Sequence, residues 1–196
     1  MGIILPQETD RIRWFFKRFN RMMVMMWRLG LGTWINFWPR VSGQIMVLTH
    51  TGRRSGRTYR TPVNFAEIGG LLYCTAGFGS RSDWALNIGA NPEVEVWLPG
   101  GWWKAIAEPA EKDPDRLVLL RRVLIASGFA AYAAGIDPVR MDDQNLAQAV
   151  CDYPLFRIRR TEACTGTGGP GDLAWIWPLT SIALLFVLIC KPRRRC

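Results

Sequence analysis

Six short stretches of β-type composition recur between residues 44 and 160, and they limit the folds open to this chain. They are residues 44–50, 58–67, 71–76, 93–98, 102–108 and 155–160. Glycine-rich turns at residues 69–70 and 99–101 are typical of hairpins between neighbouring strands. Two helices interrupt the runs. One has Asp113 as its cap, Pro114 at its first position and Gly128 as its terminator, and the other lies near residues 142–151. This order predicts a mainly β fold with inserted helices, a small antiparallel barrel, in place of alternating βαβ units.

The length of 196 residues accommodates one such domain with appendages on either side. We expect the barrel to occupy residues 41–160, after an N-terminal helical segment. Beyond the barrel, "TGTGGPGD" is typical of a flexible linker. The five expected segments are residues 1–40, 41–160, 161–172, 173–190 and 191–196.

The N-terminal segment is strongly amphipathic when its residues are placed about 100° apart on a helical wheel. One face is apolar and the opposite face is basic. The apolar face comprises Ile12, Phe15, Phe16, Phe19, Met22, Met23, Met26 and Trp27, and the basic face comprises Arg11, Arg13, Lys17, Arg18, Arg21 and Arg28. Two placements fit this pattern. The helix packs on the barrel with a solvated basic face, or it lies in a membrane interface with its arginines among the lipid headgroups.

Residues 173–190 form a stretch of 18 residues without a charge, followed by "KPRRRC". A helix of this length would extend about 27 Å, against about 30 Å for the apolar core of a bilayer. Trp175 and Trp177 at one end and Lys191 at the other are typical interfacial anchors. We therefore expect a single C-terminal membrane span, with lipid as a partner. Because no export signal precedes the barrel, we expect the barrel to be cytoplasmic.

The chain carries a formal charge of +9, but few groups suited to metal or nucleophilic chemistry. None of the five cysteines is spaced as a metal ligand, and the only histidine, His50, is expected to end a strand. No catalytic triad can be assembled around it. The positive charge favours anionic lipid or a phosphate-bearing ligand. No nucleic-acid reading module is recognisable, so we expect no nucleic-acid partner. Because the cysteines and the single histidine do not form a ligand set, we also expect no metal.

The densest positive charge lies in "VLTHTGRRSGRTYRTPV", residues 47–63, where an apolar run ends in a loop and resumes as a strand. Glycine turns expose backbone N–H groups that can bind an anion, and arginine adds bidentate hydrogen bonds to phosphate or carboxylate. The loop is not a P-loop, because no Gly-Lys-Ser/Thr follows. From composition alone, a solvated turn and an anion site fit equally well.

Together with "AGFGSRSDWALNIGANPEVEV" further along, this loop resembles the deazaflavin-dependent nitroreductase family, over roughly residues 40–160. The resemblance implies a split β-barrel, similar to FMN-binding barrels, that uses coenzyme F420. It implies that the phosphate and acidic tail of the coenzyme contact Arg53, Arg54, Ser55 and Gly56. The deazaflavin ring would lie beside Arg60, Thr61, Pro62 and Val63. Further walls of the site would be Ala76, Gly77, Phe78 and Gly79, closed by Trp84 and Asn87.

The sequence departs from this family at three positions. Many members have serine and lysine where Ala76 and Gly77 stand, and tyrosine where Ala85 stands. Tyr132 is the nearest counterpart of the family's substrate-side tyrosines, and it is the candidate catalytic residue. The resulting hypothesis is a membrane-anchored oxidoreductase that passes hydride from reduced F420 to a lipophilic acceptor such as a quinone. The alternatives are FMN as cofactor, reduction of soluble nitro compounds or enones, or a non-catalytic deazaflavin-binding protein. A homodimer is compatible with each of them.

Overall fold

The computed structural model describes residues 18–37, 39, 43–77, 79 and 82–190, and every structural statement below concerns these residues. Much of the expected N-terminal amphipathic helix, Phe78 and the basic tail at residues 191–196 lie outside them. Residues 18–28 are helical and are called the N-terminal helix below.

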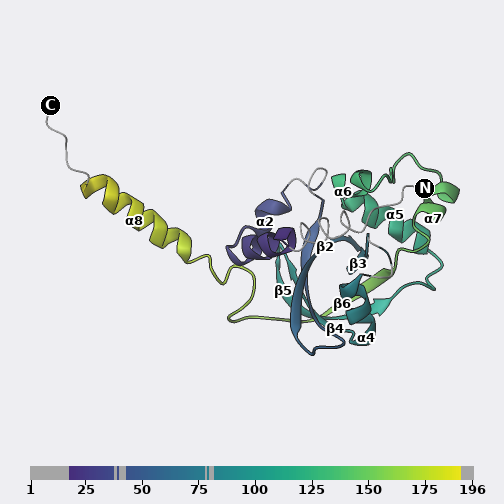
Figure 1. Ribbon diagram of the computed structural model, residues 1–196, viewed down its shortest axis with the longest axis horizontal. Coiled ribbons are helices and arrows are strands. Elements are labelled where there is room, and N and C mark those ends of the chain that lie inside the picture. The colour runs from purple at the N-terminus through teal and green to yellow at the C-terminus, as the bar shows by residue number, and fades with distance from the viewer. Residues whose placement is uncertain (1–17, 38, 40–42, 78, 80–81, 191–196) are drawn as a thin grey trace, which may run out of the picture.

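A closed antiparallel barrel forms the body of the protein, as the sequence predicts (Figure 1). Its strands are β1 (Ile45–Thr51), β2 (Thr58–Ile68), β3 (Leu71–Thr75), β4 (Glu93–Leu98), β5 (Gly101–Pro109) and β6 (Leu155–Ala163). They close in the order β1-β2-β3-β6-β5-β4. Hairpins join β2 to β3 and β4 to β5, and the second pairs Trp97 with Trp102. The barrel closes because β1 pairs with β4 and the last strand, β6, lies between β3 and β5.

The barrel interior holds the main apolar core, because alternate residues of each strand point inward. Its fully buried side chains include Met46, Leu48, Leu72, Val96 and Ile158. Residues between them point outward, where Val47 and Trp97 pack with Trp27 of the N-terminal helix.

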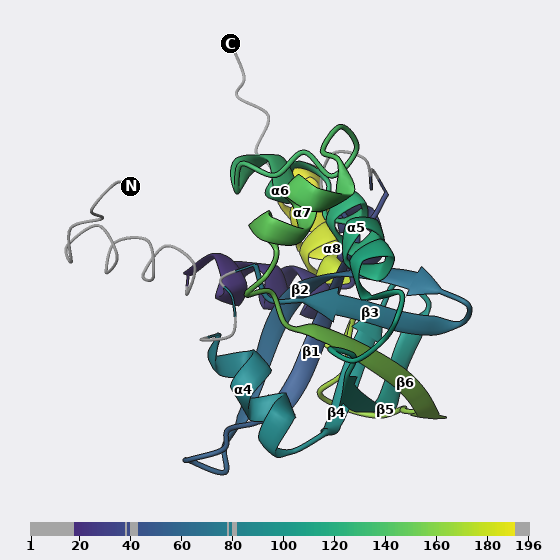
Figure 2. The same cartoon turned by 90° about the vertical axis from the view of Figure 1, so that its right-hand side faces the viewer.

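The helices are α2 (Gly32–Ile35), α4 (Asp83–Ala90), α5 (Arg116–Ala126), α6 (Phe129–Ala133), α7 (Asp143–Ala149) and α8 (Ile176–Cys190). Figure 2 shows α4 beside the β1–β2 loop, and α5, α6 and α7 together on another side of the barrel. Leu120 of α5 and Leu146 of α7 join a second core over the outer faces of β2 and β3. The start of α5 differs from the sequence prediction. The helix begins at Arg116 with Asp115 as its cap residue, while Asp113 accepts a hydrogen bond from the Asp115 N–H in the preceding turn.

The segment between the barrel and α8 is bound to the body, which corrects the expectation of a flexible linker. Strand β6 extends to Ala163, and residues 164–175, called the C-terminal arm below, contact β5, β2 and the C-terminal end of the N-terminal helix. The carboxylate of Asp172 accepts two hydrogen bonds from the Arg28 guanidinium at 2.7 and 3.0 Å. The N–H of Gly171 donates to Trp27 O and that of Leu173 to Arg28 O, both at 2.9 Å. These backbone bonds give the glycine-rich arm a defined path despite its composition.

Helix α8 is shorter than the span that the sequence predicts. It begins at Ile176 in place of residue 173, because Leu173 and Ala174 are held in turns against the body, and it contains 15 residues. At 1.5 Å per residue it extends about 22 Å. In the part of the chain that the structure describes, no helix has both the length and the apolar character needed to cross a bilayer. The predicted span is therefore not supported.

Candidate functional site

The loop that connects β1 to β2 is a tight turn whose shape depends on two glycines. The Gly52 N–H donates to Arg57 O at 2.8 Å, and the Gly56 N–H donates to Gly52 O at 2.9 Å. Gly56 has a φ of +63°, in the left-handed region that favours glycine. A Cβ at Gly52 would lie 2.6 Å from the Tyr59 ring. This turn presents the residues between the two glycines at the end of the barrel.

Arg53 turns back toward α4 and is held there by two residues. The Asn87 side-chain oxygen accepts from the Arg53 main-chain N–H at 3.1 Å and from its guanidinium at 2.9 Å. The same guanidinium lies 3.2 Å from the carboxylate of Asp83. Arg53 therefore ties the loop to α4, and its charge is already partly balanced.

Arg54 and Arg57 are the cations of this loop that remain available to a ligand. Both are exposed, and neither side chain has an ion pair or hydrogen bond among the residues that the structure describes. Ser55 stands between them, and its hydroxyl lies 3.2 Å from the Tyr59 hydroxyl and accepts from the Arg57 main-chain N–H at 3.3 Å. Two unpaired guanidinium groups beside a glycine turn are suited to phosphate or to several carboxylates.

The structure separates Arg60 from its neighbour Thr61, because successive residues of β2 point to opposite faces. The Arg60 guanidinium lies over the Trp97 ring, 4.8 Å from its centroid, and donates to Gly168 O of the C-terminal arm at 2.9 Å. Pro62 points outward, as Arg60 does, whereas Val63 is part of the barrel core. Of the four β2 residues expected beside the ring, only Thr61 and Val63 point to the inner face.

His50 lies at the centre of a polar network that the sequence did not single out. Its Nε2 is 3.1 Å from Thr61 Oγ1 and its Nδ1 is 3.3 Å from Asn87 Nδ2. Its ring stacks on Tyr59 with centroids 5.9 Å apart. Burial lowers the pKa of His50 to about 4, so the imidazole is neutral at physiological pH. A signal was present in the sequence: a polar side chain at an inward position of β1, two residues after Leu48.

The segment after β3 forms the turn expected as the next wall. Ala76 is buried in the barrel core and its carbonyl accepts from the Gly79 N–H at 2.8 Å. Gly77 is exposed, with open space where a Cβ would stand. Trp84 of α4 is partly buried and its ring lies 5.9 Å from the Phe156 ring. Trp84 thus packs against the barrel core.

Tyr132 lies apart from this network. It stands on α6, half-exposed, in the helical layer that covers β2 and β3. The structure places it on a different side of the barrel from α4 and the arginine loop (Figure 2). Its catalytic role therefore remains a prediction.

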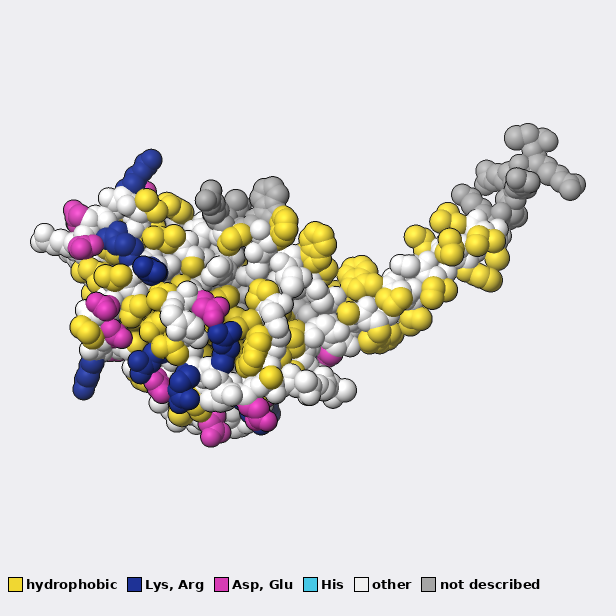
Figure 3. Space-filling model, turned by 180° about the vertical axis from the view of Figure 1, so that it is seen from behind, with side chains coloured by type: hydrophobic (Ala, Val, Ile, Leu, Met, Phe, Trp, Pro, Cys, Tyr) yellow, Lys and Arg dark blue, Asp and Glu magenta, His cyan; other side chains and the backbone are white. Residues whose placement is uncertain are grey.

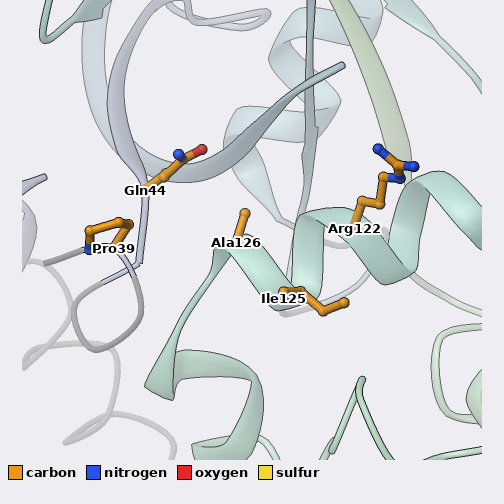
Figure 4. Close-up of a pocket in the computed structure, with 5 residues that line it drawn as sticks. All are labelled: Pro39, Gln44, Arg122, Ile125 and Ala126. Atoms are coloured by element: carbon orange, nitrogen blue, oxygen red, sulfur yellow. The ribbon is translucent and has the colours of Figure 1, made fainter. Parts of the chain in front are cut away.

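A shallow, open cavity of about 340 Å³ lies between α5 and the chain entering β1. Figure 4 shows its lining residues, Pro39, Gln44, Arg122, Ile125 and Ala126. None of them belongs to the arginine loop or to α4. Within the described ranges, no group of three or more acidic, cysteine or histidine side chains could hold a metal ion.

The geometry of the loop fits the coenzyme that the sequence implies. A phosphate with a polycarboxylate tail needs cations that are not already neutralised, and Arg54 and Arg57 meet this need. Gly56 and Gly77 leave room for close backbone approach to a ligand. The fold and this loop define the class of protein: a split β-barrel with an anion-binding loop at one end.

The comparisons with known proteins agree with this class. The model of the F420H(2)-dependent quinone reductase family matches residues 19–144. The chain therefore belongs to this family, and it is an oxidoreductase that depends on coenzyme F420. No curated protein matches the sequence.

Several solved structures are similar to this chain at low identity. An F420-H2 dependent reductase, FDR-A, is 21% identical over 59% of this chain and 94% of its own, with a TM-score of 0.45. A conserved hypothetical protein from Mycobacterium tuberculosis is 19% identical over 65% and 86%, with a TM-score of 0.42. The heme storage protein HutZ from Vibrio cholerae is 15% identical over 66% and 89%, with a TM-score of 0.42.

Proposed function

We propose that this protein reduces a lipophilic quinone with reduced coenzyme F420, while associated with a lipid bilayer. The observation that carries the coenzyme part is the pair of unpaired cations, Arg54 and Arg57, on the glycine turn beside α4. The family supports a quinone acceptor. When bound, the coenzyme supplies the hydride, and the quinone takes up that hydride and one proton to become a hydroquinone.

The residues of the chain contribute binding, orientation and exclusion of water. Arg54 and Arg57 bind the acidic tail by charge-assisted hydrogen bonds. Thr61 and Val63 lie on the inner face of β2, and Val63, Ala76 and the partly buried Trp84 belong to one apolar core. An apolar wall of this kind excludes water from a bound ring and strengthens the polar contacts around it. We assign the proton to solvent.

The membrane part of the proposal rests on apolar surface that the body leaves uncovered. None of the residues of α8 is buried, and Figures 1 and 3 show it projecting from the barrel with apolar side chains along it. Trp34 and Phe37, which follow the N-terminal helix in the chain, are 73% and 69% exposed. Basic residues follow α8 in the sequence. An apolar helix next to positive charge suits an anionic bilayer surface.

The catalytic part is tested without oxygen by mixing the full chain, in detergent, with reduced F420 and menadione and following oxidation of the coenzyme. Reduced FMN is run in parallel. Turnover with F420 alone supports the proposal. Binding of F420 without turnover of any quinone would reduce it to a coenzyme-binding protein, and turnover with FMN alone would overturn the cofactor assignment.

The membrane part is tested by flotation with vesicles of anionic or zwitterionic lipid. We expect the wild type to float with anionic vesicles and Leu185→Asp, on the exposed surface of α8, to remain in the soluble fraction. Val118→Asp, the same kind of change at an exposed position of α5, is the matched control and should float. Equal flotation of both variants would overturn the role of α8 and leave the catalytic part standing.

A further inference from the structure

The hydrogen-bond directions around Asn87 are fixed by Arg53. The main-chain N–H and the guanidinium of Arg53 are both donors, so the side-chain atom of Asn87 that faces them must be its oxygen. The amide nitrogen of Asn87 is then the atom that faces His50, and it can only donate. These two contacts leave Asn87 a single orientation.

The orientation of Asn87 in turn fixes the protonation of His50. An amide N–H points at Nδ1 of His50, so this nitrogen must accept and carry no proton. The remaining proton lies on Nε2, which donates to Thr61 Oγ1. His50 is buried, and the groups around it are Tyr59 and Thr61 of β2, Asn87 of α4 and, one step further, Arg53 and Asp83. A second proton on the imidazole would place two donors against each other.

We propose that His50 is a positioning residue of the coenzyme site, whose acceptor nitrogen Nδ1 holds the Asn87 amide and, through it, fixes Arg53 and the shape of the arginine loop. This inference rests on the coenzyme binding assigned above. It gives His50 and Asn87 an indirect role: Asn87 has both ends of its buried amide engaged by the protein, so it shapes the loop and does not touch the coenzyme. Arg53 serves as the link, while Arg54 and Arg57 project to the ligand.

The first test needs no coenzyme. Imidazole ¹⁵N resonances of the coenzyme-free chain report which nitrogen of its single histidine carries the proton. We expect a neutral ring with the proton on Nε2 at pH 7. A ring protonated on Nδ1, or a charged ring at this pH, would overturn the proposal whatever the protein catalyses.

The second test measures coenzyme affinity by quenching of intrinsic fluorescence. His50→Asn keeps an acceptor near the position of Nδ1, whereas His50→Leu removes it. We expect His50→Leu to weaken F420 binding about fivefold to tenfold, equivalent to one lost hydrogen bond of about 1 kcal/mol. His50→Asn should bind within about twofold of wild type. Equal affinity of wild type and His50→Leu would overturn the proposal, and absence of F420 binding by wild type would overturn the proposed function instead.

A double-mutant cycle separates positioning from general damage. If His50 acts through Arg53, adding His50→Leu to Arg53→Gln should weaken binding no further, whereas independent effects would multiply. If His50→Leu fails to fold, as seen in its thermal unfolding, Asn87→Ala takes its place in the cycle, because it removes the amide that Nδ1 of His50 holds. Adding Asn87→Ala to Arg53→Gln should then weaken binding no further, and multiplication of the single effects would overturn the proposal.

Discussion

Asn87 binds Arg53 twice, through the main chain at 3.1 Å and through the guanidinium at 2.9 Å, across 34 residues of sequence. This relationship divides the four arginines near the β1–β2 loop into different roles. Arg53 joins the loop to α4, and Arg60 joins β2 to the C-terminal arm. Judged on the residues that the structure describes, only Arg54 and Arg57 keep their charge available to an acidic ligand. The loop is therefore a positioned pair of cations with structural arginines on either side.

Replacing Arg54 by glutamine should weaken F420 binding about threefold to tenfold, because one charge-assisted contact to the acidic tail is lost. The loss should shrink as salt is raised from 50 to 300 mM, since screening already weakens the contact in the wild type. Titration of coenzyme fluorescence at several salt concentrations measures both effects. Arg140→Gln, at an exposed site on another part of the body, is the control. An equal loss for Arg140→Gln would show a general effect of net charge.

The stability of the coenzyme-free protein should fall as the pH is lowered from about 6.5 to about 4. The unfolded chain binds a proton at His50 near its ordinary pKa of 6.5, whereas the folded chain binds it near a pKa of about 4. Protons therefore favour the unfolded state throughout this window, by about 3 kcal/mol at its acid end. Chemical denaturation at several pH values should show this slope in the wild type and a flatter slope in His50→Asn. An identical slope in both proteins would contradict the assignment to His50.

Gly32→Ala and Gly89→Ala should have opposite effects on the free energy of unfolding. A Cβ at Gly32 would lie 2.4 Å from the ring of Trp27, which is buried and cannot move aside. Overpacking of this kind destabilises by about 1–3 kcal/mol. Gly89 is an exposed helical residue of α4 with open space around it, so alanine there should stabilise by about 0.5–1 kcal/mol. Urea denaturation of the two variants measures both signs. Unchanged stability in Gly32→Ala would contradict the contact at Trp27, and destabilisation by Gly89→Ala would contradict the open space around Gly89.

Asp172→Asn should loosen the C-terminal arm, because it removes a bidentate partner from the half-buried Arg28. We expect faster hydrogen exchange at the amides of Gly171 and Leu173, and a loss of about 1–2 kcal/mol in unfolding free energy. Glu162→Gln breaks the exposed ion pair with Lys104, which is 2.9 Å long, and should leave both the stability and the hydrogen exchange of the arm close to those of the wild type. Unchanged exchange in Asp172→Asn would show that the backbone bonds alone hold the arm.

Much of the barrel is predictable from sequence, because alternation and turn chemistry act locally. The residue pattern of "EVEVWL" and "WWKAIA" around a Pro-Gly-Gly turn is sufficient for the β4–β5 hairpin, and the structure confirms it. The loop motif and the segment "AGFGSRSDWALNIGANPEVEV" together were sufficient to predict a deazaflavin-dependent family, which the family match bears out. These features depend on residues that are close together in the chain.

The remaining features depend on contacts that no local pattern contains. The path of the C-terminal arm is set by Arg28 and Asp172, which are 144 residues apart, so its glycines alone suggested flexibility. The position of the Arg60 guanidinium depends on the Trp97 ring and on the carbonyl of Gly168. The role of His50 depends on Asn87 from a separate helix. In each case a side chain's partner, and not its type, decides what it does.

The position of β6 in the sheet has a consequence for how the chain folds. Strand β6 lies between β3 and β5, although about 80 residues separate it from β3 in the sequence. Until residues 155–163 arrive, the barrel has two open edges, and open edges can pair with other chains. Pairings across such distances are slow to form, because the entropic cost of closing a long loop comes before any stabilising contact is made. During synthesis, the barrel therefore cannot close until β6 has left the ribosome. The open edges of β3 and β5 are exposed to pairing with other chains until β6 pairs with both.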